Sequence, residues 1–99
     1  ARTYYGPANF EVVDRADFDE HGYLVVEGTV RNNGTSTAQY VKVTVTIFDD
    51  LGRVVATDTT FAQKQQLLPG EITGYQITFF ELGGDATRYL STAQATLEQ

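Results

Sequence analysis

No cysteine occurs among the 99 residues of the chain. This absence excludes a disulfide framework, a thiolate nucleophile and a cysteine-based zinc site. A chain of this length buries roughly two thirds of the surface that it exposes when unfolded, so one apolar core can stabilise it without cross-links. We therefore expect a single domain over residues 1–99, in which residues 1–8 form a flexible lead-in.

Histidine is almost as scarce: His21 is the only one, and Ser36 and Ser91 are the only serines. One histidine cannot form a multi-histidine metal site, and turn or strand positions explain both serines without a catalytic relay. The acidic pair at 49–50 is explained by turn capping more simply than by glycoside hydrolysis, which needs two carboxyl groups across a cleft. We expect no enzyme activity, and the sequence predicts neither a cofactor nor a metal centre.

Long apolar runs and positive charge are also missing. No window approaches 18 uninterrupted apolar residues, and the first five residues lack the apolar run of a signal peptide. With 13 acidic residues against 7 basic ones, the formal net charge is −6, which repels phosphate backbones and anionic membrane surfaces alike. We expect a monomer that neither binds nucleic acid nor inserts directly into a membrane.

Alternation of apolar and polar residues fills most of the chain, and residues 39–49 show it most clearly. Valine and isoleucine occupy positions 41, 43, 45 and 47, while lysine and threonine occupy the positions between them. A period of two is typical of a strand with one buried face and does not fit a helix. The same pattern predicts five further strands, over residues 10–15, 23–32, 53–62, 71–81 and 86–97.

Turn signals separate these strands. The Asn-Gly pair at 33–34 predicts a tight reversal that joins the strands on either side into a hairpin. The Asp-Asp-Leu-Gly turn at 49–52 leads into a strand whose less polarised pattern suits a sheet edge, and Asp58 fits an exposed place on that edge. The Pro-Gly step at 69–70 predicts a loop that crosses between sheets.

The last segment, residues 86–97, has two interpretations. Its alternate residues fit a strand, whereas Leu90, Ala93 and Leu97 also fit one face of a helix. We favour the strand because threonine and serine are poor helix formers. Six or seven strands, with a turn about every ten residues, predict an all-β fold: an immunoglobulin-like antiparallel β-sandwich of six to seven strands.

Four blocks of sequence extend this interpretation, namely residues 26–34, 40–49, 52–58 and 68–71. Their order and spacing over about residues 23–80 resemble the FxLYD-type domains of bacterial and archaeal surface proteins. The motif that names the family falls on Val45, Ile47, Phe48 and Asp49, where the family has Phe, Leu, Tyr and Asp. The resemblance implies an immunoglobulin-like module of an exported or membrane-anchored protein, and it carries over no functional residue.

Weak candidate binding residues are found in the acidic segment 17–22 and among the aromatic residues. The segment with Asp17, Asp19 and Glu20 resembles the first half of a calcium loop in having acids at positions one and three and glycine at position six. Positions five and twelve are His21 and Gly28, which supply no carboxylate. The simpler interpretation is a hydrated acidic turn.

Three aromatic residues lie opposite the best apolar stripes: Tyr23, Tyr40 and Phe48. Those that are exposed are expected to form a contact patch. The alternative interpretation is that these rings pack in the core or at the ends of strands.

Two functional hypotheses follow. The first is a non-catalytic extracytoplasmic module, secreted or at the cell surface, that contacts another protein or a neighbouring domain of its own chain, or spaces such domains. The second is a carbohydrate- or calcium-binding domain that uses the acidic 17–22 loop together with nearby aromatic residues.

Overall fold

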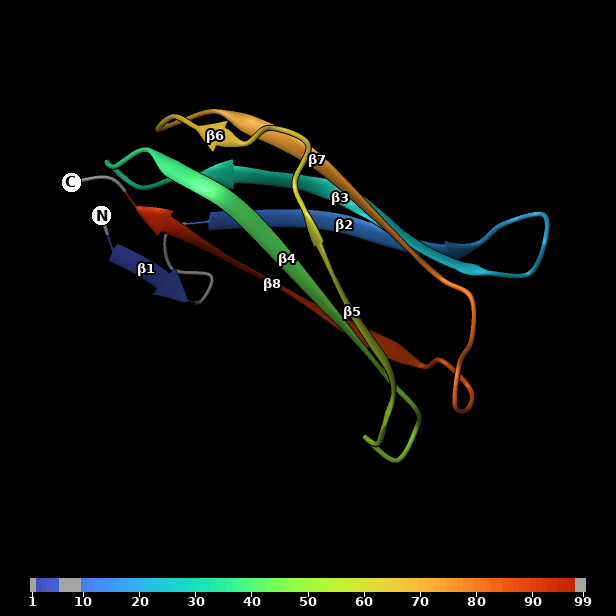
Figure 1. Cartoon of the computed structure of the whole chain (residues 1–99). Coiled ribbons are helices and arrows are strands. Elements are labelled where there is room, and N and C mark those ends of the chain that lie inside the picture. The colour runs from blue at the N-terminus through green and yellow to red at the C-terminus, as the bar shows by residue number, and fades with distance from the viewer. Residues whose placement is uncertain (1, 6–9, 98–99) are drawn as a thin grey trace.

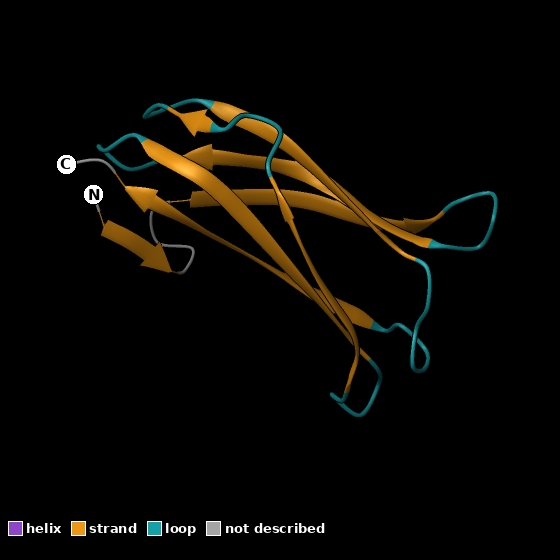
Figure 2. Ribbon diagram, in the orientation of Figure 1, coloured by secondary structure: helices purple, strands orange, loops and turns teal. Residues whose placement is uncertain are grey.

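The protein is described by a computed structural model that covers residues 2–5 and 10–97. Every regular element in these ranges is a β-strand (Figure 2). The strands, in chain order, are β1 (Arg2–Tyr5), β2 (Phe10–Phe18), β3 (Leu24–Asn32), β4 (Ala38–Phe48), β5 (Val54–Phe61), β6 (Gln66–Leu67), β7 (Ile72–Phe79) and β8 (Arg88–Leu97). The all-β prediction is confirmed. The described residues contain no helix that is long and apolar enough to span a bilayer.

The strands form two antiparallel sheets that pack face to face (Figure 1). The larger sheet has the order β1-β8-β4-β5, with β6 paired to the start of β4, and the smaller has the order β2-β3-β7. β5 contacts β7 on one side of the sandwich, and β8 contacts β2 on the other. This arrangement is the predicted β-sandwich.

The strand order matches part of that of an immunoglobulin constant-type domain, in which A, B, E and D lie in one sheet and C, F and G in the other. β2, β3 and β7 take the places of A, B and E, while β4 and β8 take those of C and F. The place of G, beside F, is occupied by β1, which comes from the opposite end of the chain. β1 pairs only with residues 94–97 of β8.

The six predicted strands correspond to β2, β3, β4, β5, β7 and β8, and the last segment is a strand rather than a helix. Two short strands were not predicted. β6 adds two residues to the larger sheet. β1 lies within the stretch predicted to be a flexible lead-in, but it is a strand because its backbone pairs with β8. The rest of that lead-in, residues 1 and 6–8, lies outside the described residues.

The core lies between the sheets and uses the alternate residues that the pattern predicts. On β4 the buried residues are Val41, Val43, Val45 and Ile47, each at most 1% exposed. Leu24, Val26 and Val30 of β3 and Tyr75, Ile77 and Phe79 of β7 face them from the other sheet. Burial of these side chains supplies the main driving force for folding, on the order of 25 cal/mol for each Å² of apolar surface removed from water.

The predicted hairpin between residues 23–32 and 39–49 is wrong. β3 pairs with β2 and β7, whereas β4 pairs with β5, β6 and β8, so the connection crosses from one sheet to the other. A tight Asn-Gly hairpin turn needs positive φ, yet neither Asn33 nor Gly34 has it. Since the faces of β3 and β4 are both apolar, packing them across the core buries both.

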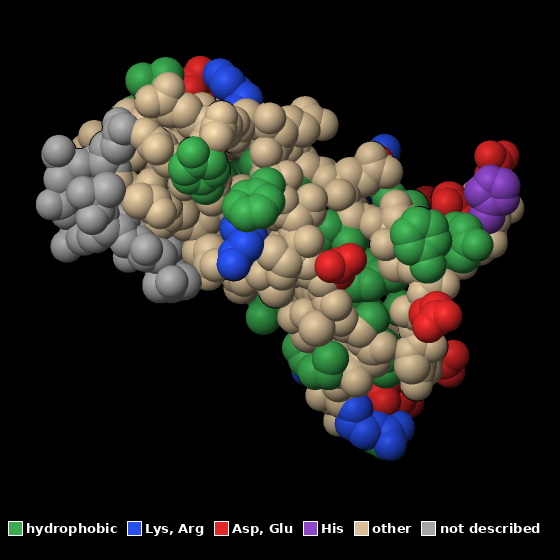
Figure 3. Space-filling view, viewed as in Figure 1, with side chains coloured by type: hydrophobic (Ala, Val, Ile, Leu, Met, Phe, Trp, Pro, Cys, Tyr) green, Lys and Arg blue, Asp and Glu red, His purple; other side chains and the backbone are tan. Residues whose placement is uncertain are grey.

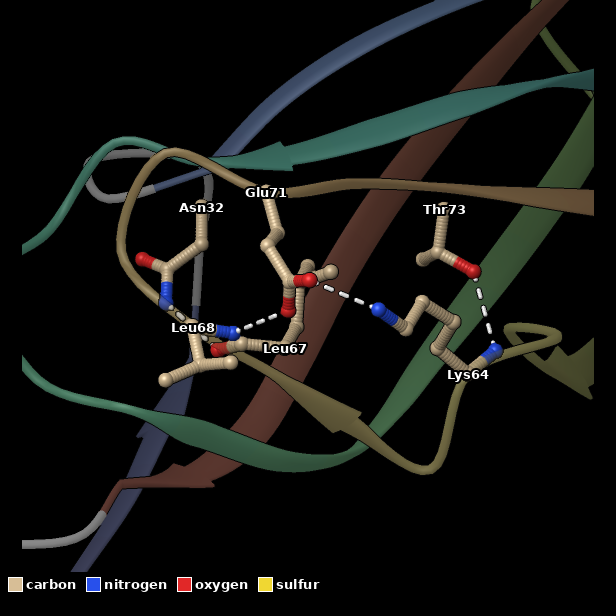
Figure 4. Close-up of polar contacts among 6 residues, drawn as sticks. All are labelled: Asn32, Lys64, Leu67, Leu68, Glu71 and Thr73. Carbon is tan, nitrogen blue, oxygen red and sulfur yellow. Dashed lines mark hydrogen bonds and ion pairs between the residues drawn. The ribbon is translucent and has the colours of Figure 1, made fainter.

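The crossover is held by the side chain of Asn32, which is 1% exposed. Its amide nitrogen donates to the carbonyls of Ser36 and Leu67, both at 2.9 Å, and its side-chain oxygen accepts from the Gly34 N–H. Asn32 therefore ties β3 to the crossover loop and to β6 (Figure 4). Buried polar groups remain favourable when they are satisfied in this way.

A second set of contacts fixes the loop between β6 and β7 at the same end. Glu71 accepts from the Leu68 N–H at 2.8 Å and from the Lys64 ammonium at 2.7 Å, and Thr73 accepts from the Lys64 N–H at 2.9 Å (Figure 4). Gly70, with φ of 85°, makes the turn that the Pro-Gly step predicts. The loop crosses between the sheets as predicted.

The turn at 49–52 forms as its sequence predicts. Asp49 is buried, and its carboxylate accepts from the N–H groups of Leu51 and Arg53 at 2.9 and 2.8 Å and from the Arg53 guanidinium at 2.8 Å. Gly52 adopts φ of 79°. Asp49 is also the position at which the chain agrees with the FxLYD motif, and its role here is to close the turn.

We expect acid to destabilise the protein partly through Asp49 and Glu71. Hydrogen bonds from the Arg53 N–H and the Lys64 side chain, respectively, lower the pKa of each carboxyl below its ordinary value. A lowered folded pKa stabilises the protein above the ordinary range, near pH 4, and this stabilisation is lost as the pH falls through the folded pKa. Urea midpoints measured from pH 7 down to pH 2.5 should fall, and Asp49→Asn should flatten the profile.

Asp50→Asn is the matched control, because Asp50 is exposed and accepts none of the bonds that close the turn. An Asp49→Asn profile as steep as that of the wild type would contradict this assignment.

Candidate functional site

The two sheets diverge toward the end opposite Asn32 (Figure 1). One arm of the divergence carries the loop between β2 and β3, and the other carries the turn between β4 and β5. Acidic side chains and the single histidine gather at the tip of the first arm, with apolar side chains beside them (Figure 3). This arm holds four of the five predicted site residues: Asp17, Asp19, Glu20 and Tyr23.

The aspartates of this arm accept hydrogen bonds from nearby backbone N–H groups. β2 continues to Phe18, so the loop predicted over residues 17–22 begins at Asp19. The Asp19 carboxylate accepts from the N–H groups of His21 and Tyr23, both at 2.9 Å, and the Asp17 carboxylate accepts from the Phe18 N–H at 2.8 Å. Glu20 lies 3.6 Å from His21 at the exposed tip.

These acids do not converge on a common point. Within residues 2–5 and 10–97, no three His, Asp or Glu side chains are grouped so that they could hold a metal ion. The contacts of Asp19 are those of a capped turn, the simpler interpretation of this segment, whereas Asp17 bonds within β2.

Tyr23 meets a partner that the sequence pattern does not reveal. Its ring packs edge to face on Phe80, with centroids 4.9 Å apart, and Phe80 is 68% exposed. His21 lies 6.2 Å from Tyr23. We call Tyr23, Phe80 and His21 the aromatic tip. The parity of Phe80 is opposite to that of the buried Phe79, so alternation alone could have marked it as exposed, but its contact with Tyr23 could not be read from the sequence.

Tyr40 lies at the other end of the sandwich. Its N–H donates to the Gln65 carbonyl at 2.8 Å, and it interrupts the register between β4 and β8 with φ of 55°. Its side chain is 53% exposed, in agreement with its predicted place opposite the apolar stripe. The structure therefore does not bring Tyr40 and Tyr23 into one patch. Phe48, the third aromatic candidate, carries the Arg88 guanidinium 4.8 Å above its ring.

On two edge strands, an aspartate carboxylate accepts a hydrogen bond from the backbone N–H of the next residue. On β5, Asp58 accepts from the Thr59 N–H at 2.8 Å, and on β2 the Asp17 bond to Phe18 has the same form. Asp58 is exposed at the edge as predicted. A charged side chain that satisfies an edge N–H hinders the addition of a further strand there.

A hollow of about 520 Å³ lies on the outer face of the smaller sheet above Gly74. The ion pair between Arg15 and Glu27, at 2.8 Å, borders it. None of the predicted binding residues lines this hollow.

A smaller cleft of about 310 Å³ opens between the diverging arms, between β2 and the start of β8. Its apolar lining residues are Ala16, Phe18, Leu24, Ile47, Ala86 and Tyr89. Phe18 is 58% exposed at this cleft.

A polar group on the inner face lies beside this cleft. The Tyr75 hydroxyl donates to the Asp14 carboxylate, and the Tyr89 hydroxyl donates to the Asp14 carbonyl at 3.3 Å. Burial raises the pKa of both tyrosine hydroxyls above their ordinary range, and Asp14 raises them further. Both hydroxyls are therefore neutral donors at physiological pH, which suits packing rather than acid-base catalysis.

A scan against protein-family models and searches of curated proteins and of solved structures found nothing that matches the chain.

Proposed function

We propose that the chain is a non-catalytic contact module, which binds another protein or a neighbouring domain through the aromatic tip. The observation that carries the proposal is the exposed ring pair of Tyr23 and Phe80 at the end of the sandwich away from β1 and the end of β8. Exposed aromatic side chains are enriched where proteins bind each other, because they bury a large area at a small cost in side-chain entropy.

The pairing of β1 with β8 favours a role in binding a partner over a role in spacing domains apart. Arg2 of β1 pairs with Leu97 of β8, so segments before and after the domain would leave from the same end. A spacer holds its neighbours apart best when they attach at opposite ends. A domain 42 Å long that is attached at one end instead presents its far end to a partner.

The extracytoplasmic location and the FxLYD-type family are parts of this proposal. Their support is the order of the sequence blocks and the role of Asp49, the residue that agrees with the family motif, in closing a turn. Cell fractionation with an antibody against the domain tests the location.

We expect a photoreactive phenylalanine analogue in place of Phe80 to form a discrete adduct with a protein or domain in the native host. The same analogue in place of Leu51 is the matched control, since Leu51 is 71% exposed on the other arm. Adding Tyr23→Ser should reduce the Phe80 adduct at least tenfold, as expected for an aromatic contact at the centre of an interface. The readout is mass spectrometry of the purified adduct.

An equal yield from both positions, or an adduct that Tyr23→Ser leaves unchanged, would count against the contact function. The carbohydrate- or calcium-binding alternative predicts something different. Millimolar calcium or a cell-wall glycan would then shift the amide signals of Asp17, Asp19 and Glu20 and raise the melting temperature. Turnover of any substrate would overturn both hypotheses.

A further inference from the structure

We propose that the open edge of β8 is a second binding surface, which accepts an extended segment of a partner chain as an added strand antiparallel to β8. We define the open edge as residues 88–93 of β8. It is separate from the aromatic tip and does not depend on the function proposed for that tip.

The open edge has unpaired backbone groups. β8 has ten residues and pairs with β4 along most of its length, but β1 covers only residues 94–97 on the other side. In the part of the chain that the structure describes, no strand pairs with residues 88–93 on the β1 side. A row of unpaired N–H and C=O groups is a template for a further strand.

The open edge also lacks the protection that the edges of β2 and β5 have. Asp17 on β2 and Asp58 on β5 each occupy a backbone N–H of their own edge. Residues 88–93 read Arg-Tyr-Leu-Ser-Thr-Ala and include no carboxylate, glycine or proline. The chain therefore protects two edges against strand addition and leaves this one accessible.

The chemistry beside the open edge indicates what the added strand presents to the domain. The cleft between β2 and β8 adjoins it and is lined mainly by apolar side chains, including Ala16, Phe18 and Ala86. A strand beside β8 would turn alternate side chains toward this space, so they should be apolar, as in other cases of strand addition.

The strand β1, which already pairs with β8, indicates the direction and the length of the added strand. β1 runs antiparallel to β8 and stops opposite Gln94, so the added strand continues the line of β1 toward Arg88. Six residues of extended chain cover this stretch, about 20 Å. The occupant is thus a segment of about six residues with apolar side chains at alternate positions.

The test uses a synthetic peptide of alternating valine and threonine with lysine at both ends, added to the isotope-labelled 99-residue chain. We expect the amide signals of residues 88–93 to shift with a dissociation constant below 1 mM, and their hydrogen exchange to slow. The same peptide with alternate amides N-methylated cannot pair as a strand and should not bind.

Leu90→Asp should weaken peptide binding at least tenfold, because it places a carboxylate on the open edge as Asp17 and Asp58 do on theirs. Leu90 is 56% exposed, so the fold should be retained. Ile72→Asp introduces the same carboxylate at an exposed position of β7, in the other sheet, and should leave binding unchanged. Ala86→Leu, which fills the cleft, should also weaken binding.

Several results would overturn the proposal. They are no shift at millimolar peptide, shifts confined to β2 or β5, equal binding of the N-methylated peptide, and no effect of Leu90→Asp. Concentration-dependent dimerisation through residues 88–93 would instead identify a second copy of the chain as the occupant, and would contradict the partner segment. Loss of the Phe80 adduct bears only on the aromatic tip, so the two proposals fail independently.

Discussion

Gly28→Ala is expected to destabilise the protein by about 3 kcal/mol or more, since overpacking against a backbone cannot be relieved by a change of rotamer. Gly28 lies in the middle of β3, opposite Asp14 of β2. A β-carbon at this position would overlap the carbonyl oxygen of Val13 and lie 2.6 Å from the α-carbon of Asp14. The two strands would have to separate locally. Urea unfolding followed by circular dichroism measures the effect.

Gly74→Ala provides the matched control in the neighbouring strand of the same sheet. The atoms nearest to a β-carbon there would be those of the Gln63 side chain, at 3.2 Å and beyond, and that side chain is exposed and can move. We expect a change within about 1 kcal/mol of the wild type, because alanine is generally no worse than glycine inside a strand. Equal stabilities of the two variants would contradict this prediction, because they would show that β2 can move away from a β-carbon at position 28 without loss of stability.

Asn32→Ala is expected to destabilise the protein by about 2–3 kcal/mol, the cost of leaving buried groups unpaired. The substitution removes both bonds of the Asn32 amide nitrogen and the bond that its oxygen accepts from Gly34. The buried carbonyl of Leu67 then loses this donor. Thermal and urea unfolding of the variant measure the loss.

Asn33→Ala is the control for this prediction, because Asn33 is the next residue and is exposed. Its effect should stay within about 0.5 kcal/mol. If both variants lost the same stability, the crossover would depend on the loop backbone rather than on the buried amide.

The candidate site was only partly predictable. Tyr23 and Tyr40 were predicted from their parity against an apolar stripe, and both are exposed. Parity says nothing about neighbours, so the pairing of Tyr23 with Phe80 and the separation of Tyr23 from Tyr40 could not be foreseen. The acidic segment was assigned correctly as a turn from Asp19 onward, because an aspartate at the start of a turn bonds to backbone N–H groups within its own reach, whereas Asp17 and Phe18 belong to β2.

The hairpin error has the same origin. An Asn-Gly pair permits a tight reversal, but the choice between a hairpin and a crossover depends on where two apolar faces find the most burial. In this chain Asn32 holds the crossover from β3 toward Leu67, a residue distant in sequence. A local turn signal cannot include a contact of that kind.

The amino-acid sequence by itself determined the six longer strands, the apolar faces that β3, β4 and β7 bury and the closed turn at Asp49, because alternation and turn chemistry act over a few neighbouring residues. Only the tertiary structure decided which strands share a sheet, why Gly28 must lack a side chain, where the aromatic tip forms and which edge of β8 stays open. These features depend on pairings between distant segments, and each pairing is selected by the packing of the whole sandwich rather than by any one stretch of the chain.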